Sequence, residues 1–318
     1  MKKCFLYLIP LAIGWQYKMQ KSGVVQNTVC TSRRLPPYLL KKVRLGGPTY
    51  ELKKLLRSLG VNTVCESARC PNISECFEQG ELTFMIMGTV CTRNCGFCGV
   101  ASGKPLLLDH LEPEKVAAAA CRLKLRYIVV TSVTRDDLDD GGAAHFAACI
   151  TTLRENLQEA KIEVLVPDFR GRRAALKRVI AGKPDVLAHN IETVERLYPL
   201  VRPGSNYERS LGILRAASGW SPETLVKSGF MVGLGETDDE IYQLMRDIRS
   251  TGCSMLTIGH YLPPTVKNLS LVSPHPPGEF QKYREQALGL GFKSVKSGIF
   301  VRSSYQAYDQ MKSARRDK

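Results

Sequence analysis

Six cysteines lie close together in this sequence, in two groups of three. The stretch CESARCPNISEC has the spacing C-x4-C-x5-C, and CTRNCGFC, fifteen residues further on, has the spacing C-x3-C-x2-C. The groups consist of Cys65, Cys70 and Cys76, and of Cys91, Cys95 and Cys98. Tetrahedral metal ions and cubane iron–sulfur clusters normally take four protein ligands, so each group is one ligand short. Because a metal site with an open position is usually reactive, the missing ligands indicate the chemistry.

The second group suits a cluster with one open iron. Three thiolates can hold three irons of a four-iron cluster, and the amino and carboxylate groups of a methionine-derived ligand can chelate the fourth. A structural zinc ion is the alternative, but it needs a fourth cysteine or histidine, and the nearest histidine in sequence is His110. The spacing resembles the signature of the radical S-adenosylmethionine (SAM) enzymes. In that superfamily a reduced 4Fe–4S cluster cleaves SAM, and the resulting 5′-deoxyadenosyl radical removes hydrogen from an unactivated carbon.

The first group has a less specific spacing, which a zinc knuckle or a redox-active triple would also fit. The motif RSSYQA (302–307), near the other end of the chain, offers the hydroxyl of Ser304 as a fourth ligand. Serine is a harder and more basic ligand than thiolate, so its bond to iron should be the easiest one in such a cluster to release. Arg302 either anchors this segment electrostatically or forms a surface salt bridge.

Alternating strand and helix patterns supply the elements that must position these residues. Apolar runs predict six strands, over 83–88, 127–133, 162–168, 185–192, 229–235 and 255–262. Helical patterns separate them, a short amphipathic helix over 49–59 precedes them, and the first cysteine group is expected in a loop. Repeated strand-then-helix units predict an α/β fold with a parallel sheet. Six units are fewer than the eight of a closed barrel, so we expect a partial (β/α)6 TIM-like barrel, with a flat doubly wound sheet as the alternative.

The motifs taken together carry a closer resemblance. The chain resembles the lipoyl synthase family from about Arg34 to Ala307, through CESARCPNISEC, FMIMGTVCTRNCGFC, TSVTRDDLDDGGAAHF, LVPDFRG, AHNIETVERLYPLVRPG, KSGFMVGLGET and VRSSYQA. The resemblance implies two 4Fe–4S clusters: an auxiliary cluster held by Cys65, Cys70, Cys76 and Ser304, and a SAM cluster held by Cys91, Cys95 and Cys98. The second group and Ser304 would be the catalytic residues.

The family's reaction implies further cofactors and partners. Two sulfur atoms from the auxiliary cluster are inserted at C6 and C8 of an octanoyl chain on a lysine of a carrier protein, and one SAM is consumed for each insertion. The carrier is a lipoyl domain or the glycine cleavage H protein. An electron donor such as ferredoxin or flavodoxin and an iron–sulfur carrier that rebuilds the auxiliary cluster are also expected, whereas nucleic acid and membrane are not.

Polar and glycine residues at the carboxyl ends of the strands are expected, by the same resemblance, to bind SAM. They are Thr131, Ser132, Arg135, Asp136, Asn190, Glu192, Gly233, Gly235 and Glu236. At each position a helix cap or turn residue is the alternative. His189 and His260 also lie at strand ends and are expected to be structural.

The charge distribution places weak limits on partners. The net charge is +15, but nine basic and no acidic residues occupy positions 1–50, which leaves 36 basic and 30 acidic residues in the rest of the chain. Such a modest excess suits an acidic protein or an anionic cofactor as well as nucleic acid. Clustered cysteines indicate metal binding in a reducing compartment, so a cytoplasmic enzyme is predicted.

The N-terminal sequence leaves its own role open. MKKCFLYLIPLAIGW is shorter than the about 20 apolar residues that span a bilayer, although it resembles the front of a secretory signal. Export fits badly with thiols that await iron. A true start near Met19, an organellar presequence for a mitochondrial or plastid matrix, and a genuine extension are the three readings.

The predicted organisation is a basic, partly disordered or wrongly started N-terminal extension (1–48), one catalytic domain (49–307) and a solvated tail (308–318). Within the domain we expect an auxiliary-cluster segment (60–80), a barrel core (82–265) and a C-terminal cap (266–307). The scattered thiols are expected to be buried as small hydrophobic residues; they are Cys4, Cys30, Cys121, Cys149 and Cys253.

Three features depart from the family pattern. Thr134 stands where aspartate is usual, His260 stands where glutamine is usual, and HPPG (275–278) is inserted before the last helix, where it is expected to lengthen a surface loop. None of them changes a predicted iron ligand. Two other functions are weighed: a zinc-stabilised nucleic-acid-binding module, and a sulfur-inserting enzyme of the biotin synthase or methylthiotransferase type, against which VRSSYQA argues.

Overall fold

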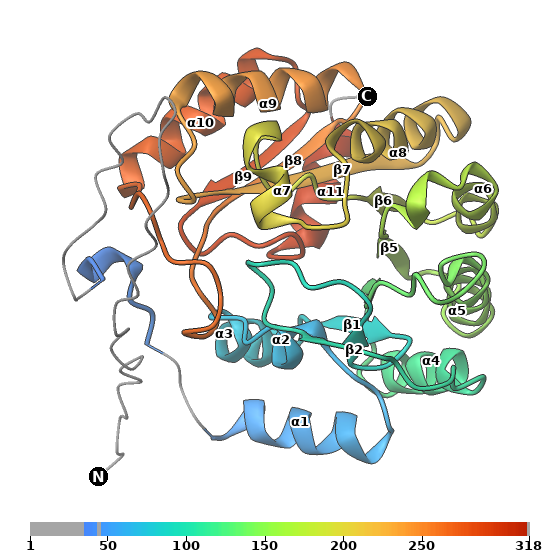
Figure 1. Cartoon of the computed structure of the whole chain (residues 1–318). Coiled ribbons are helices and arrows are strands. Elements are labelled where there is room, and N and C mark those ends of the chain that lie inside the picture. The colour runs from blue at the N-terminus through green and yellow to red at the C-terminus, as the bar shows by residue number, and fades with distance from the viewer. Residues whose placement is uncertain (1–34, 43–45, 317–318) are drawn as a thin grey trace, which may run out of the picture.

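Seven parallel strands form the central sheet of the computed structural model, which describes residues 35–42 and 46–316. They pair in the order of the sequence (Figure 1), as β1 (Thr83–Ile86), β4 (Tyr127–Ser132), β5 (Lys161–Leu165), β6 (Val186–Ala188), β7 (Leu225–Val232), β8 (Met255–His260) and β9 (Ser294–Gly298). A doubly wound sheet would reverse its strand order near the middle, so that alternative is excluded. In the described chain β1 and β9 are the two edges of the sheet, and the barrel is therefore open, as predicted.

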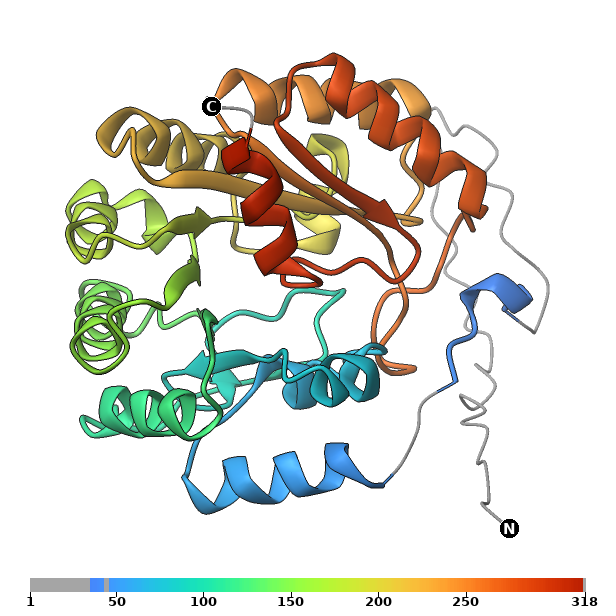
Figure 2. The same ribbon diagram turned by 180° about the vertical axis from the view of Figure 1, so that it is seen from behind.

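Helices cover the outer face of the curved sheet (Figures 1 and 2). They are α4 (Glu112–Arg122), α5 (Ala143–Asn156), α6 (Arg173–Ala181), α8 (Tyr207–Trp220), α9 (Asp238–Ser250) and α10 (Pro277–Gly289). Helix α9 shows why they form where the sequence predicts them. It begins with a capping box between Thr237 and Glu240, and its buried apolar residues recur every three or four positions, from Ile241 to Ile248.

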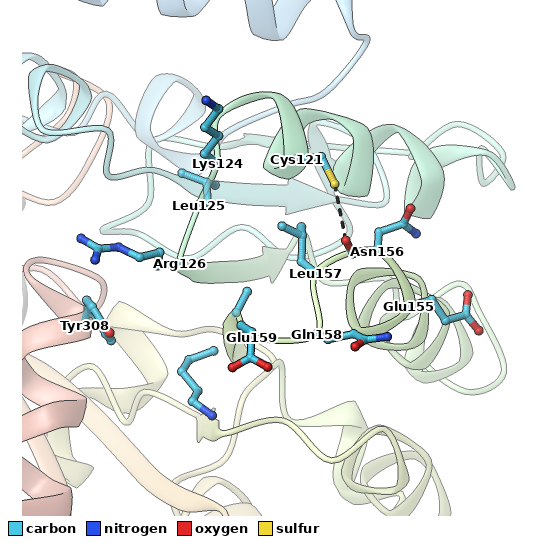
Figure 3. A pocket seen from close by; sticks show the side chains of 12 residues that line it. Cys121, Lys124, Leu125, Arg126, Glu155, Asn156, Leu157, Gln158, Glu159 and Tyr308 are labelled. Atoms are coloured by element: carbon cyan, nitrogen blue, oxygen red, sulfur yellow. Dashed lines mark hydrogen bonds between the residues drawn. The ribbon is translucent and has the colours of Figure 1, made fainter.

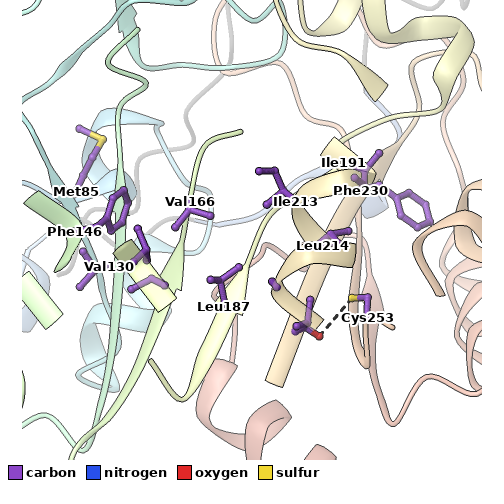
Figure 4. Close-up of a cluster of buried hydrophobic side chains, with 14 of the residues drawn as sticks. Met85, Val130, Phe146, Val166, Leu187, Ile191, Ile213, Leu214, Phe230 and Cys253 are labelled. Carbon is purple, nitrogen blue, oxygen red and sulfur yellow. Dashed lines mark hydrogen bonds between the residues drawn. The ribbon is translucent and has the colours of Figure 1, made fainter. Parts of the chain in front are cut away.

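One large apolar cluster joins the sheet to these helices (Figure 4). Val130 and Leu187 of the strands and Phe146 of α5 are fully buried in it. Cys253 is also fully buried, with its thiol donating to the backbone oxygen of Val226 at 3.4 Å. Cys149 is buried as well, so the prediction for the scattered cysteines holds at these two positions.

Cys121 contradicts that prediction, because it is exposed on α4. Helix α4 turns this position away from the core, where Ala119 and Ala120 are fully buried instead. Cys4 and Cys30 lie outside the described residues, as does the proposed start near Met19.

Several short elements surround the barrel. Helix α1 (Pro48–Ser58) confirms the predicted amphipathic helix. The first cysteine group was expected in a loop, but it lies on and between two short helices, α2 (Val64–Ser67) and α3 (Ile73–Glu78). The remaining elements are β2 (Val90–Cys91), β3 (Ala101–Ser102), α7 (Tyr198–Val201) and the 3-10 helices Pro37–Leu39, Phe169–Gly171 and Glu195–Leu197.

Helix α11 (Ala307–Arg316) corrects the prediction of a solvated tail over 308–318. It lies across the amino ends of the later strands (Figure 2), where Gln310 donates to the backbone oxygen of Leu256 at 2.9 Å. Met311 and Ala314 pack with Val186 and other first residues of strands in a second apolar cluster. The last turns of the chain therefore close one end of the barrel. In the described part of the chain, no helix is long and apolar enough to cross a membrane.

Truncation of Met311 should measure what α11 contributes. Met311 is 3% exposed, so Met311→Ala should lower the free energy of unfolding by about 2–5 kcal/mol, as is usual for buried methionine. Denaturant unfolding would measure the difference. Ser313→Ala, an exposed position on the same helix, should stay within about 0.5 kcal/mol of wild type. Equal stability of the two variants would contradict the packing described for α11.

Candidate active site

The second cysteine group lies on the loop that leaves β1, at the carboxyl ends of the strands. The Cys91 sulfur accepts hydrogen bonds from the backbone N–H groups of Arg93 (3.4 Å) and Thr134 (3.3 Å). The Asn268 side chain donates to the backbone oxygens of Gly96 and Cys98, at 3.2 and 2.8 Å, and holds the loop from the other side. Because Thr134 contributes its backbone, the side chain that replaces the usual aspartate does not enter this contact.

The thiols of the second group lie within electrostatic reach of one another. Burial raises the pKa of Cys98 to about 12, and the charges of Cys95 and Cys91 raise it as well. Burial likewise raises the pKa of Cys95, which the nearby Arg202 partly offsets. Cysteines bind iron as thiolates, and the positive charge of iron would favour that form of Cys95 and Cys98 against the effect of burial. The donor set therefore fits three ligands of a 4Fe–4S cluster.

Two thiols of the first cysteine group also have raised pKa values. Burial and the charge of Cys70 raise the pKa of both Cys65 and Cys76 to about 12. No three Cys, His, Asp or Glu side chains of the described residues gather as a single metal ion requires. In a four-iron cluster each thiolate binds a different iron, so the ligands surround the cluster and do not converge on one point.

Thr83, the first residue of β1, contacts both the first cysteine group and the C-terminal motif. Its backbone lies within hydrogen-bonding reach of the Cys65 thiol, and its hydroxyl donates to the Ser304 hydroxyl at 2.8 Å. Ser304 follows Thr83 by 221 residues in the chain. Thr83 thus lies between Ser304 and Cys65 and contacts both.

Other contacts tie the segment after β9 to the cysteine helices. Asn72 donates to the backbone oxygen of Phe300 at 2.6 Å, and the Tyr305 hydroxyl donates to Glu75 at 2.7 Å. Lys41 forms an ion pair with Glu75 at 2.7 Å and lies 5.1 Å from the centre of the Phe300 ring. Arg302 interacts electrostatically with Cys70 and with Glu192 on the barrel rim, which favours the anchoring role over a surface salt bridge.

The predicted SAM-binding residues all lie at the carboxyl ends of the strands, but several are occupied by protein contacts. Glu236 accepts hydrogen bonds from the backbone of Gly233 and Leu234, both at 2.9 Å, and so caps its own turn. Arg135 pairs with Asp137 at 2.8 Å. Asp136 pairs with Arg93, Thr131 donates to a backbone oxygen, and Gly233 and Gly235 have positive φ angles of 118° and 102°.

Two of these residues retain unused polar atoms, and a third, Glu192, lies beside them. The Ser132 hydroxyl and the Asn190 Oδ1 atom are buried without a hydrogen-bond partner among the described residues. Glu192 accepts from Asn190 at 3.0 Å, and burial raises its pKa, while Arg202 lowers it. Buried polar atoms are normally satisfied, so these positions point to an absent ligand.

Three arginines of the site escaped the sequence predictions. Arg93 binds Asp136 at 2.7 Å and Asp168 at 2.7 Å, and Arg209 binds the other oxygen of Asp168 at 2.7 Å. Burial would raise the pKa of Asp168, but Arg93 holds it well below its usual range. Arg202 donates to the backbone oxygen of Asn190 at 2.9 Å. For Arg93, the sequence did hold a signal, because this residue lies between two cysteines of the second group.

Two departures from the family pattern contact each other. The Nε2 atom of His260 accepts a hydrogen bond from the backbone N–H of His275 at 3.0 Å. The ring proton therefore lies on Nδ1, which donates to the backbone oxygen of Tyr261 at 2.7 Å. His275 belongs to the HPPG insertion and is only 6% exposed. The insertion therefore does more than lengthen a surface loop. His189 donates to the backbone oxygen of Val166 at 2.8 Å, which agrees with a structural role.

A surface pocket lies at the opposite ends of the strands (Figure 3). Its lining includes Cys121, Arg126 and Lys161, which precede or begin β4 and β5. Chemistry at the cysteine groups cannot use it, because the barrel separates the two ends.

Comparison with known proteins decides the family. Residues 85–248 match the radical SAM superfamily, and residues 14–70 match the N-terminal domain of lipoyl synthase. A lipoyl synthase from Rubrobacter xylanophilus is 52% identical over 85% of this chain and 84% of that protein. The chain belongs to the lipoyl synthase family. Lipoyl synthases from Caldicellulosiruptor saccharolyticus (48% identical, over 87% of this chain and 97% of that protein) and Methylococcus capsulatus (50%, over 87% and 86%) agree.

Family membership confirms the predicted enzyme class. The chain is a radical SAM sulfurtransferase of lipoate biosynthesis, with a 4Fe–4S cluster and SAM as cofactors. Its lipoyl synthase relatives imply an octanoylated carrier as substrate and a reductant as electron source. The zinc-binding nucleic-acid module is thereby excluded.

Solved structures agree on the fold. Methylornithine synthase superposes with a TM-score of 0.50 and 15% identity, over 78% of this chain and 70% of that chain. Streptococcus suis SuiB superposes with a TM-score of 0.51 and 10% identity, over 84% and 58%. At these identities the likeness shows the fold alone.

Replacing His260 should change how stability depends on pH. Burial, with His275 nearby, lowers the pKa of His260 from 6.5 to about 4, so the folded protein holds this ring neutral. Below pH 6.5 the unfolded chain binds the proton first, and stability falls. From pH 7 to pH 5 the free energy of unfolding of wild type should therefore fall by about 2 kcal/mol through this residue. The variant His260→Gln lacks the titrating ring and should not show this part of the decrease.

Denaturant unfolding at several pH values would measure this difference, with His110→Gln as the control because His110 is exposed. Parallel stability curves for wild type and His260→Gln would contradict the assignment.

Proposed function

We propose that Cys65, Cys70, Cys76 and Ser304 hold an auxiliary 4Fe–4S cluster, and that Cys91, Cys95 and Cys98 hold the SAM cluster. The observation that carries this proposal is the contact of Thr83 with both Cys65 and Ser304, at 2.8 Å from the latter. When bound, the SAM cluster and SAM supply the radical that removes hydrogen from the octanoyl chain, and the auxiliary cluster supplies the sulfur.

The protein's own residues then have distinct tasks. The backbone amides of Arg93 and Thr134 stabilise negative charge on the Cys91 sulfur. Ser132 and Asn190 offer SAM the polar atoms that the protein leaves unused, and Glu192 adds a carboxylate beside them. Residues already engaged within the fold shape the same rim; they are Thr131, Arg135, Asp136, Gly233, Gly235 and Glu236.

Ser304 has the most specific task. With a cluster bound, Ser304 would hold one iron through oxygen, a ligand that sulfur-rich iron releases more easily than a thiolate, and that iron would be the one to become accessible to substrate. Ser304 lies beside β1, an edge strand of the sheet, so access to it would not require a path through the apolar core.

The specific partners follow from the same proposal. The carrier is a lipoyl domain or the glycine cleavage H protein, the reductant is a ferredoxin or flavodoxin, and an iron–sulfur carrier rebuilds the auxiliary cluster. Free thiols require a reducing compartment, for which we propose the cytoplasm, or a mitochondrial or plastid matrix if residues 1–48 are a presequence.

Ser304→Ala should separate hydrogen abstraction from sulfur insertion. With octanoylated carrier peptide, SAM and a strong reductant, the variant should still form 5′-deoxyadenosine, because the second cysteine group is intact. Lipoyl product, measured by mass spectrometry of the peptide, should fall at least about a hundredfold, as when a catalytic group is removed. Normal yields of lipoyl product would overturn the assignment of Ser304.

Iron content should separate the two cysteine groups. Wild type purified without oxygen should hold about eight irons, and Cys70→Ala or Cys95→Ala about four, since each site holds four. Cys95→Ala should also form no 5′-deoxyadenosine. Cys121→Ala provides a matched control, because Cys121 is exposed and lies outside both groups. Unchanged iron in either group variant would contradict the proposal.

A further inference from the structure

Two adjacent hydroxyls reach opposite parts of the site. Ser303 accepts a hydrogen bond from Asn190 Nδ2 at 2.5 Å, whereas Ser304 accepts one from Thr83 at 2.8 Å. Asn190 follows β6 on the rim proposed to bind SAM, and Thr83 begins β1 beside the first cysteine group. Consecutive Cα atoms lie about 3.8 Å apart, so a displacement of one serine moves the other.

The rim side of this link is rigid. Asn190 is 8% exposed, and a side chain at Gly229 would come within 3.2 Å of its Oδ1 atom. The backbone N–H groups of Ile191 and Glu192 both donate to the Gly229 oxygen at 3.1 Å. Glu192 has a φ of 72°, a conformation that non-glycine residues adopt only when their surroundings impose it. The 190–192 turn therefore has little freedom of its own.

A second contact runs in parallel. Arg302 precedes Ser303 and interacts electrostatically with Glu192 on the rim and with Cys70 in the auxiliary group. The turn thus holds Ser303 by a hydrogen bond and acts on the preceding Arg302 through its charge alone, while the Arg302 side chain donates to the backbone oxygen of Val301 at 2.7 Å. The residue after Ser303 is Ser304.

We propose that Ser303 is a positioning residue that links SAM binding at the Asn190 turn to retention of the Ser304 ligand by the auxiliary cluster. This inference rests on the proposed function. SAM that donates to the unpaired Oδ1 atom of Asn190 fixes the amide whose Nδ2 atom holds Ser303, and Ser304 then stays on iron until substrate is in place. Without the Ser303 hydroxyl, Ser304 loses one of its two anchors, and the auxiliary cluster releases iron independently of SAM.

Iron release to a chelator that binds both ferrous and ferric iron, without reductant or carrier, tests the proposal on the reconstituted full-length protein. SAM should slow release from wild type. Ser303→Ala should release four irons about two to ten times faster than wild type, the range that one hydrogen bond accounts for, and SAM should not change its rate. Ser303→Thr keeps the hydroxyl and should retain the SAM effect. Ser313→Ala, an exposed serine on α11, should behave as wild type.

The outcomes distinguish the two proposals. If wild type holds about eight irons but Ser303→Ala matches it in release rate and SAM effect, the link is overturned and the two-cluster assignment stands. If wild type holds only about four irons, both proposals fail. Mössbauer spectra of Ser303→Ala provide a second readout, since a loosened Ser304 should alter the signal of one iron and leave the SAM cluster unchanged.

Discussion

The site depends on the contact between Thr83 and Ser304 across the open seam of the barrel. An incomplete barrel leaves two sheet edges, β1 and β9, with backbone groups that must be covered. The segment before β1 covers one edge, where Thr63 bridges Phe84, and the segment after β9 extends from the other, where Ile299 accepts from the backbone of His260. These two covering segments carry the first cysteine group and Ser304. A requirement of the fold thus assembles the donor set.

The regular part of the fold could be predicted from the sequence, because apolar periodicity marks strands and helices that pack on one core. The failures have physical causes. Strand β9 has the sequence SVKSG, which offers only one apolar side chain to such a test. Strand β7 begins at Leu225, earlier than predicted, because Lys227 is buried within it and neutralised by Glu163 at 2.9 Å. Helix α11 was missed because its buried stripe is narrow and its remaining residues are strongly polar.

The cysteine groups of the site could be predicted, because metal binding restricts the spacing of cysteines along the sequence. Residues whose role depends on a partner far away in the chain could not be predicted in this way. Nothing in the sequence shows that Glu236 is used by its own turn, or that Arg93 joins Asp136 to Asp168. Those partners follow different strands, β1, β4 and β5, and only the pairing of these strands side by side brings them together. His260 and His275 make the same point, because two departures from the family pattern prove to be in direct contact.

The long separation between Thr83 and Ser304 also has a consequence for biosynthesis. While the ribosome is still translating the later strands, the first cysteine group has been made but Ser304 has not. The contact between Thr83 and Ser304 therefore forms only after the strands that separate them have been synthesised, and the segment that carries the first cysteine group reaches its final surroundings late in folding.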